Sequence, residues 1–384
     1  MQENYKVVDL FCGCGGFGLG SELAGFHSVA AVDVDETLQS AYKLNFPTTR
    51  VVKGDLSTMD KDSWKLILQD QRIDGIIGGP PCQGYSRIGK REIGDPRNEL
   101  LHHYFRHISI IKPKFFLMEN VEGLLDECYR DSFYEALDSI KDNYTILEPV
   151  LIDASDYGAA TKRKRVIVFG YKPEYFGEIV HGDIFSPING NNSITVSDAI
   201  SDLPEPIPQT KEKTDFGWAK YNRKKKLSPY TLKMRELPPK HLGSELAIKK
   251  LKNKMLSGFF DTVHTKEVMT RYLALEPEKV DKISRSKKLS WKGVSPTLRA
   301  GTGSDKGSYQ AVRPIHPSSP RVITVREAAR LQGFPDWFCF HPTKWHSFRM
   351  IGNSVSPIVS ENIMTNIKNR LDFFKQEREH LLKK

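Results

Sequence analysis

Two side chains in this sequence follow apolar segments and could do covalent chemistry together. Pro80-Pro81-Cys82-Gln83 comes after the apolar run from Ile73 to Ile77. Each proline fixes its own backbone angle and restricts the residue before it, so this stretch would hold the Cys82 thiol out from the end of a buried strand. A second apolar run, Phe115 to Met118, ends in Glu119. A thiol and a carboxyl group in these positions predict a nucleophile assisted by an acid.

A pair of arginines precedes a third apolar run, Val166 to Phe169. In an extended chain Arg163 and Arg165 point to the same face, because successive side chains of a strand alternate. Two guanidinium groups on one side suit a phosphate or a base carbonyl as ligand. An ordinary basic strand edge would give the same pattern, so the pair alone does not choose between the two interpretations.

A glycine-rich turn follows the first apolar run, within the sequence Asp9-Leu10-Phe11-Cys12-Gly13-Cys14-Gly15-Gly16-Phe17-Gly18. Its glycines match the dinucleotide-binding pattern, which keeps a nicotinamide or flavin enzyme as an alternative. The acids Asp33 and Asp55 follow the next two strand-like runs and could accept hydrogen bonds from ribose hydroxyls. Together these residues predict an adenosyl-ligand site at the carboxyl ends of adjacent strands.

The elements that would position these residues alternate between strands and helices over residues 5–170. Apolar runs separated by amphipathic stretches, such as Asn98 to Ile111, are typical of a parallel sheet covered on both faces. We therefore predict an α/β fold with a doubly wound, mostly parallel, Rossmann-like sheet. The predicted strands are Val7–Phe11, Val29–Val32, Arg50–Lys53, Ile73–Ile77, Phe115–Met118 and Val166–Phe169.

The middle of the chain differs from the rest in composition and periodicity. From about residue 172 to 320, prolines, glycines and the basic runs Arg223 to Lys226 and Arg285 to Lys288 replace long periodic segments. Either run is equally compatible with solvated surface. This composition predicts an irregular basic lobe over residues 186–321, separate from an α/β domain made of residues 1–185 and 322–384.

The last part of the chain should return to the α/β domain. Thr324 and Glu327 form a capping-box pattern that opens a short helix, and Gly333 closes it. A final helix follows Pro357 and carries an apolar face that must pack on a partner. That face is formed by Val359, Ile363, Ile367 and Leu371.

Composition narrows the classes of partner and compartment. The 384 residues carry a net charge of +10 and a pI near 9.1, which favours a polyanionic partner. No apolar run approaches the length of a membrane helix, and no signal peptide is recognised, so we expect a cytoplasmic protein. Five unevenly spread cysteines fit free thiols in a reducing compartment, and no metal site is expected.

With these motifs, the sequence resembles the DNA (cytosine-5)-methyltransferase family over nearly all of the chain outside the middle lobe. The motifs that carry the resemblance occur in the family's order. They are DLFCGCGGFGLG, Asp33, GDLS, GGPPCQGYS, MENVEG, TKRKR, REAARLQGFPD and GNSVSP. One departure is Thr161, where the family usually has glutamine before the Arg-x-Arg strand.

The resemblance implies a role for individual residues. It implies Cys82 as the nucleophile, Glu119 as its partner acid, and Arg163 with Arg165 as the pair that holds the target base. It implies S-adenosylmethionine as cofactor, with S-adenosylhomocysteine as product. The implied cofactor pocket comprises Phe11, Gly13, Cys14, Gly15, Gly16, Asp33, Val34, Asp55, Leu56, Pro81, Leu100, Asn353 and Val355.

Catalysis of this kind requires the target cytosine to leave the duplex, and the basic lobe is the expected DNA reader. Glycines in the stretch 295–303 would let backbone amides approach phosphates. The implied DNA contacts are Ser86, Arg299, Gly301 and Gly303. We expect a monomer that methylates carbon 5 of cytosine in a short duplex sequence. Its binding to DNA would associate it with the nucleoid, and a cognate restriction endonuclease could belong to the same system.

Three alternatives stay open at the level of sequence. A tRNA cytosine methyltransferase would use the same catalytic parts, although the long basic lobe favours DNA. A nicotinamide dehydrogenase would explain the glycine turn but leave Pro80 to Gln83 and the arginine pair unexplained. A DNA-binding module without activity would require a degenerate pocket, whereas nucleophile, acid and glycine turn are all present.

Overall fold

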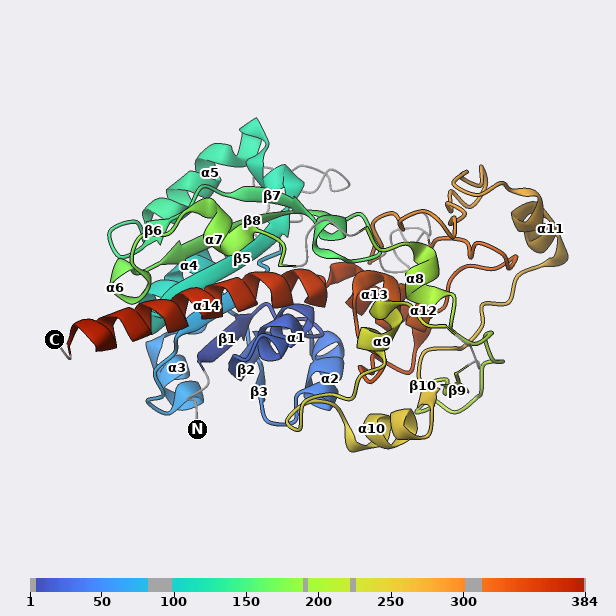
Figure 1. Ribbon diagram of the computed structural model, residues 1–384, viewed down its shortest axis with the longest axis horizontal. Helices are drawn as coiled ribbons and strands as arrows, with labels where there is room; N and C mark the ends of the chain where they lie inside the picture. Colours follow the sequence, from blue (N-terminus) through green and yellow to red (C-terminus); the bar gives the residue numbers. More distant parts are fainter. Residues whose placement is uncertain (1–4, 82–98, 189–192, 222–225, 301–312, 383–384) are drawn as a thin grey trace.

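A computed structural model describes residues 5–81, 99–188, 193–221, 226–300 and 313–382 (Figure 1). Over these residues the α/β part is built on an eight-stranded sheet with the order β3-β2-β1-β4-β5-β8-β6, and β7 also pairs with β8. The strands are β1 Lys6–Leu10, β2 His27–Asp33, β3 Arg50–Lys53, β4 Gly75–Gly78, β5 Phe115–Val121, β6 Thr145–Ile146, β7 Val150–Asp153 and β8 Lys164–Tyr171.

The first five strands are parallel and the remaining three are not. Strands β3, β2, β1, β4 and β5 run in one direction, as the sequence predicted. Strand β8 pairs antiparallel with β5, and β6 and β7 pair antiparallel with β8. The inclusion of Val166–Phe169 among the parallel strands was therefore wrong. The connection from β7 to β8 is too short for a crossover helix, and such short connections permit only antiparallel neighbours.

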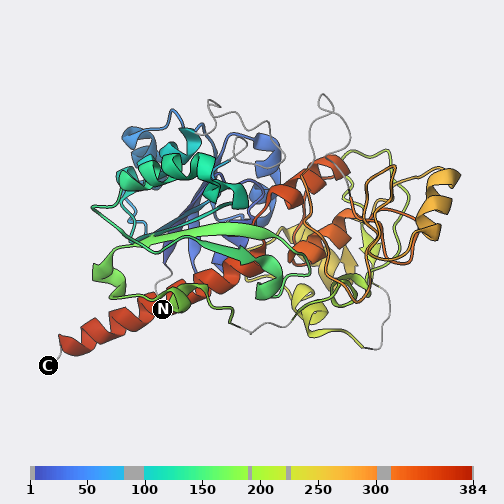
Figure 2. The ribbon, with the colours of Figure 1, turned by 90° about the horizontal axis from the view of Figure 1, so that it is seen from above.

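Helices cover both faces of the sheet, so that each strand is buried on two sides (Figure 2). Successive strand residues enter separate apolar clusters: Val7 packs with α1, α2 and α14, whereas Val8 packs with α3, α4 and α5. This alternation explains why the strands are apolar without interruption. These helices are α1 Gly16–Leu23, α2 Glu36–Asn45, α3 Lys61–Leu68, α4 Glu99–Ile111, α5 Glu127–Asp138 and α14 Pro357–Leu381.

Helix α14 brings the end of the chain back to the α/β part. All four apolar residues predicted for its buried face are buried, and Ser360 Oγ donates to the Phe17 carbonyl of α1 at 2.7 Å. The shorter helix before it, α12 (Val325–Gln332), has the predicted capping box between Thr324 and Glu327 and ends at Gly333 with a left-handed φ of 95°. The predicted return of the chain is confirmed in Figure 1.

The middle of the chain consists of short helices, loops and a small antiparallel ribbon beside the α/β part (Figure 1). The remaining elements are α6 Pro173–Phe176, α7 His181–Phe185, α8 Val196–Ile200, β9 Ala219–Lys220, α9 Pro229–Met234, α10 Glu245–Lys252, β10 Met255–Leu256, α11 Lys266–Ala274 and α13 Lys344–Asn353. Two single turns of 3-10 helix lie at Glu122–Leu125 and Ala154–Tyr157. None of the described helices is both long and apolar enough to cross a bilayer.

A buried ion cluster joins the middle of the chain to α12. Arg330 is fully buried; its Nε lies 2.5 Å from Asp336 and its Nη1 lies 3.2 Å from Asp202. Asp202 also pairs with Arg235 at 2.6 Å. The two arginines hold the pKa of Asp202 below its ordinary value in spite of its burial. Asp202 therefore remains charged, and it depends on its cationic partners for solvation.

The second basic run is only partly available to a polyanion. Lys288 is buried, and its Nζ donates to the carbonyl oxygens of Tyr272, Leu273 and Leu275. It therefore satisfies the carbonyls at the end of α11, a position that favours a cation. Solvated surface, one of the two interpretations given to this run, does not apply to Lys288.

Candidate active site

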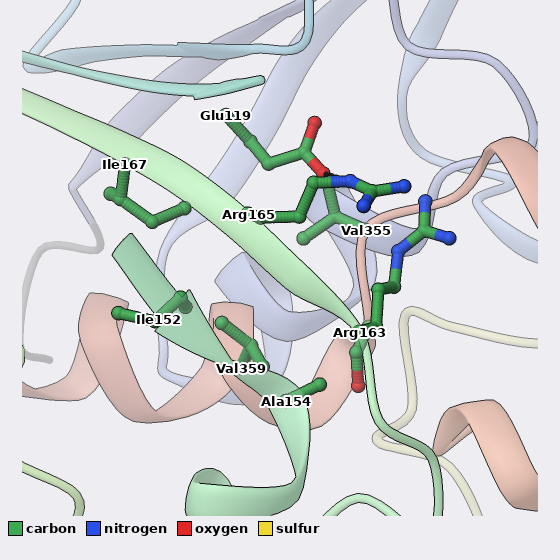
Figure 3. Close-up of a pocket in the computed structure, with 9 residues that line it drawn as sticks. Glu119, Ile152, Ala154, Arg163, Arg165, Ile167, Val355 and Val359 are labelled. Carbon is green, nitrogen blue, oxygen red and sulfur yellow. Dashed lines mark ion pairs between the residues drawn. The ribbon is translucent and has the colours of Figure 1, made fainter. Parts of the chain in front are cut away.

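Three of the predicted catalytic side chains line one small pocket beside β5 and β8 (Figure 3). The pocket is lined by Glu119, Ile152, Ala154, Arg163, Arg165, Ile167, Val355, Ser356 and Val359. In the antiparallel register Glu119 lies opposite Ile167, and Arg165 is two residues from Ile167 on the same strand. Glu119 and Arg165 are thus diagonal neighbours on one face.

Glu119 and Arg165 form an ion pair in this pocket. Arg165 Nε lies 2.8 Å from Glu119 Oε1, and the Glu119 side chain is almost entirely buried. Figure 3 shows the Glu119 carboxyl group directed toward the guanidinium group of Arg165. In spite of the short distance, Oε1 accepts no aligned hydrogen bond from the described residues. A buried carboxyl oxygen in this condition can take a polar partner from a ligand.

Arg163 is buried at the same pocket and lacks a carboxylate partner of its own among the described residues. Its Nη1 donates to the Gly352 carbonyl oxygen at 3.0 Å, and its backbone N–H donates to Asp153 Oδ1 at 2.9 Å. Its Nε is buried without a partner. Burial, together with the positive charge of Arg165, lowers the Arg163 pKa to about 9, so the group stays charged at neutral pH. Such a cation suits an acceptor oxygen brought by a ligand.

The start of the proline-cysteine stretch lies beside the same carboxyl group. A Cβ atom at Gly79 would stand 3.3 Å from Glu119 Oε2, and Asn120 Nδ2 donates to the Pro80 carbonyl oxygen at 3.2 Å. The end of β5 is thereby bonded to the residues that lead into Cys82. Cys82 itself, together with Ser86, Gly301 and Gly303, lies outside the described residues.

The glycine turn after β1 is fixed by Asp33 and leaves open space at its centre. The Gly13 amide donates to Asp33 Oδ2 at 2.8 Å, while the Asp35 amide donates to Oδ1. Burial raises the Asp33 pKa above its ordinary value, although these amides oppose the rise. Gly13 has a left-handed φ of 53°, and a Cβ there would meet no atom within 4 Å. A ligand can therefore approach the backbone closely at Gly13.

The glycine turn meets residues 353–355 at the end of α13. A Cβ at Gly16 would stand 1.8 Å from Ser354 Oγ and 2.4 Å from the Val355 carbonyl oxygen, so only glycine fits. Nearby, Cys14 Sγ donates to the Met350 carbonyl oxygen at 3.6 Å. Since Val355 also lines the pocket of Arg163, the glycine turn and that pocket are neighbours. The sequence placed these residues in one site, and the structure brings them together.

The remaining residues expected at the cofactor pocket differ in exposure. Val34 is 65% exposed, which leaves an apolar surface free at the end of β2. Asp55 and Asn353 are exposed, Leu56 is buried, and Phe11, Gly15, Pro81 and Leu100 range from buried to half-buried. An open backbone position at Gly13 and a free apolar side chain at Val34 fit a ligand that carries a nucleoside.

Two residues missed by the sequence analysis fix the turn at Leu56. Arg106 Nη2 and His107 Nε2 both bond to the Leu56 carbonyl oxygen, at 2.7 and 2.8 Å. Trp64 Nε1 donates to His107 Nδ1, so Nε2 carries the ring proton, and burial lowers the His107 pKa to about 4. The sequence analysis gave no function to these residues because a histidine in a helix carries no signal of its partner.

Comparison with known proteins assigns a family to this geometry. The family model described as C-5 cytosine-specific DNA methylase matches residues 5–369. The type II methyltransferase M.XorII of Xanthomonas oryzae pv. oryzae is 40% identical over 378 residues, covering 95% of this chain and 84% of that protein. The type II methyltransferase M.DdeI of Desulfomicrobium norvegicum is 29% identical over 400 residues, covering 94% of this chain and 88% of that protein.

Solved structures agree with these sequence matches. A prophage-encoded E. coli protein described as a DNA modification methyltransferase superposes with a TM-score of 0.85 at 41% identity, covering 96% of this chain and all of that chain. The Dnmt2 methyltransferase of S. pombe, at 17% identity and a TM-score of 0.63, shares the fold over 96% of this chain and all of that chain. The chain thus belongs to the C-5 cytosine-specific DNA methylase family and is a DNA (cytosine-5)-methyltransferase.

Proposed function

We propose that Cys82 is the nucleophile of this methyltransferase and that Glu119, Arg163 and Arg165 hold and activate the cytosine ring. The observation that carries the proposal is the pocket in which the Glu119–Arg165 ion pair faces Arg163, whose Nε is buried without a hydrogen-bond partner. Buried polar atoms without partners are costly, so a pocket that keeps a cationic donor free beside a carboxyl group supports a polar, planar ligand.

The role of Cys82 follows from the reactivity of the base. Carbon 5 of cytosine is a weak nucleophile, and addition of a thiolate to carbon 6 moves electron density onto carbon 5. A cysteine thiol has an unperturbed pKa of about 8.5 and ionises more readily beside cationic groups such as guanidinium. After carbon 5 has been methylated, its proton passes to a water molecule and the electron pair of that bond restores the ring double bond. The Cys82 thiolate is then expelled, and N3 returns its proton to Glu119.

Glu119 acts on ring N3 in this proposal. The Glu119 carboxylate, paired with Arg165 before the base enters, takes up a proton from water as the base binds. As the thiolate adds, Glu119 gives this proton to N3, so that the ring does not accumulate negative charge. The carboxylate that remains is balanced by Arg165, whose Nε lies 2.8 Å away. Arg163 donates to the ring carbonyl oxygen through the side of its guanidinium group that Gly352 does not occupy.

S-adenosylmethionine is the proposed cofactor, and when bound it supplies the electrophilic methyl group. The residues that would hold it are those of the glycine turn, the strand ends after it and the 353–355 segment. Gly13 offers space for close backbone approach, Asp33 and Asp55 offer oxygens to ribose hydroxyls, and Val34 offers an apolar surface to the adenine. Arg106 and His107 keep the Leu56 turn in place.

Residues 186–321 are proposed to form the target-recognition lobe, separate from a catalytic domain of residues 1–185 and 322–384. In support, Arg299 is exposed in the segment that leads out of this lobe toward the catalytic pocket, and phosphate contacts need exposed cations. Because similar proteins are named type II methyltransferases, we propose methylation of a short duplex sequence in a restriction-modification setting. We further propose a cytoplasmic monomer that needs no stable complex with an endonuclease.

Covalent trapping tests the proposed mechanism. Duplex DNA carrying 5-fluorocytosine at the methylated position has no proton to lose at carbon 5, so the protein should stay attached through Cys82 when S-adenosylmethionine is supplied. Peptide mapping of the adduct identifies the sulfur atom. Methyl transfer to ordinary duplex DNA without any adduct on the fluorinated duplex would reject a covalent role for Cys82, and transfer to tRNA alone would reject the DNA substrate.

A further inference from the structure

We infer that Thr161 is a positioning residue for Arg163, acting through a segment that belongs to the middle of the chain. This inference rests on the proposed role of Arg163. The segment consists of residues 295–300 and is called the strap below. It is anchored in the apolar core by Leu298, which is 5% exposed, and it carries the exposed Arg299. Thr161 stands where the family usually has glutamine, and its side chain is fully buried.

The strap is bonded along the residues that lead into β8. Thr161 Oγ1 donates to the Pro296 carbonyl oxygen at 3.1 Å, with the Ser295 carbonyl oxygen at 3.4 Å. The backbone forms a parallel bridge here, in which the Lys162 amide donates to the Ser295 carbonyl oxygen and the Ser295 amide donates to the Ala160 carbonyl oxygen. The strap and the strand of Arg163 are therefore one bonded unit, in which Thr161 supplies the buried side-chain bond.

The strap also touches the group that holds the Arg163 guanidinium. A Cβ at Gly352 would stand 2.3 Å from the Ala300 amide nitrogen and 2.5 Å from the Arg299 carbonyl carbon, so the two backbones are in direct contact. The Gly352 carbonyl oxygen is the acceptor for Arg163 Nη1. Arg163 thus follows directly on residues that are bonded to the strap, and its guanidinium group bonds to Gly352, which contacts the same strap.

This closed arrangement links the middle of the chain to base activation. If the Thr161 bond is lost, the strap can shift relative to β8, and the Gly352 carbonyl then moves relative to the Arg163 guanidinium. Small displacements of groups that hold a reacting substrate lower turnover strongly. Since Thr161 itself is buried, and Arg299 on the strap is one of several proposed DNA contacts, loss of the Thr161 bond should affect turnover far more than the affinity for DNA or cofactor.

Steady-state kinetics of Thr161→Val, which keeps the shape and removes the hydroxyl group, test this inference. We expect kcat to fall about tenfold, the size of effect set by one hydrogen bond, with less than about a twofold change in the dissociation constants for duplex and cofactor. Thr161→Ser, which keeps the hydroxyl group, should restore turnover. The matched control is Thr231→Val, because the buried Thr231 Oγ1 likewise lies near two acceptors away from the pocket, the Asp198 carbonyl oxygen at 2.8 Å and Asp202 Oδ1 at 3.3 Å.

Thermal unfolding of the same variants separates positioning from stability. Thr161→Val and Thr231→Val should lose similar stability, while only Thr161→Val loses turnover. Unchanged kcat in Thr161→Val, or an equal fall in kcat in Thr231→Val, would overturn the inference. Failure of the proposed function gives a different result. If the proposed function is wrong, the wild-type protein forms no adduct with 5-fluorocytosine DNA. If only the role of Thr161 is wrong, the wild-type protein forms the adduct and Thr161→Val turns over normally.

Discussion

Arg163 donates through Nη1 to the carbonyl oxygen of Gly352 at 3.0 Å, although 189 residues separate the two in the sequence. Gly352 lies in the same turn as Asn353 and Val355, which belong to the expected cofactor pocket. The contact therefore joins the groups that would hold the base to the groups that would hold the cofactor. It also gives a carbonyl acceptor to a buried cation whose pKa is lowered by burial and by Arg165.

Substitution of Gly352 should disturb this contact directly. A Cβ in Gly352→Ala would collide with the Ala300 nitrogen at 2.3 Å, and backbone atoms cannot rotate away. We expect kcat to fall about 100-fold, the cost typical of a misplaced binding group. Measurement of methyl transfer to duplex DNA, with circular dichroism to verify folding, checks the prediction. Wild-type turnover in a folded Gly352→Ala protein would show that the Arg163 contact is dispensable.

Replacement of Glu119 tests whether this residue transfers a proton to the base. Glu119→Gln keeps the shape of the side chain and can donate a hydrogen bond from its amide, but it cannot transfer a proton to N3. We expect kcat to fall about 100-fold or more, within the range for a general acid. The dissociation constant for S-adenosylmethionine should stay unchanged, because Glu119 is not among the residues proposed to hold it. A variant with normal kcat would assign Glu119 a purely structural role.

The buried ion cluster should dominate the stability of the junction between the middle of the chain and α12. Arg330→Met removes the main partner of Asp336 and one partner of Asp202, so the free energy of unfolding should fall by about 3–5 kcal/mol. Lys141→Met is the control, because Lys141 forms an exposed pair with Asp138 and its loss should cost less than about 1 kcal/mol. Urea titration of both variants measures the difference, and equal losses would contradict the prediction.

The contact between α1 and the middle of the chain should depend on pH. His241 Nε2 lies 2.8 Å from the buried Glu22, and the hydrogen bond to Glu22 raises the His241 pKa above its ordinary 6.5. Burial opposes ionisation of Glu22, but the bonds from His241, His27 and the Ser28 amide lower its pKa below 4.5. The pair therefore contributes most between about pH 4.5 and 6.5, and its contribution is lost as pH rises through the raised pKa of His241.

A comparison of wild type with His241→Gln isolates this contribution. The difference in unfolding free energy should be largest between pH 5 and 6 and should shrink as the pH is raised toward 9, since His241 loses its proton there. Urea titrations at several pH values measure it. A difference that grows with pH would show that the neutral imidazole makes the stabilising contact.

Much of the fold could be predicted because the patterns involved are local. The strands from β1 to β5, the capping box of α12 and the buried face of α14 each depend on a few neighbouring residues. The direction of β8 could not be predicted, because it depends on how the chain passes through β6 and β7. Contacts such as Arg106 with Leu56, and Gly352 with Arg163, arise from tertiary packing between segments whose sequences do not reveal their partner.

The reversed direction of β8 has a consequence for the order of functional residues along the chain. In a parallel strand the residues that reach this edge of the sheet come after the apolar run, as Glu119, Pro80 and Pro81 do. In β8 the amino end lies at that edge, so Arg163 and Arg165 come before their apolar run. In this sheet the functional residues of the parallel strands follow their apolar runs, whereas those of the antiparallel strand precede its apolar run. A polar pair placed before an apolar run is thus a sign of an antiparallel strand, and it could be sought in other chains of unknown topology.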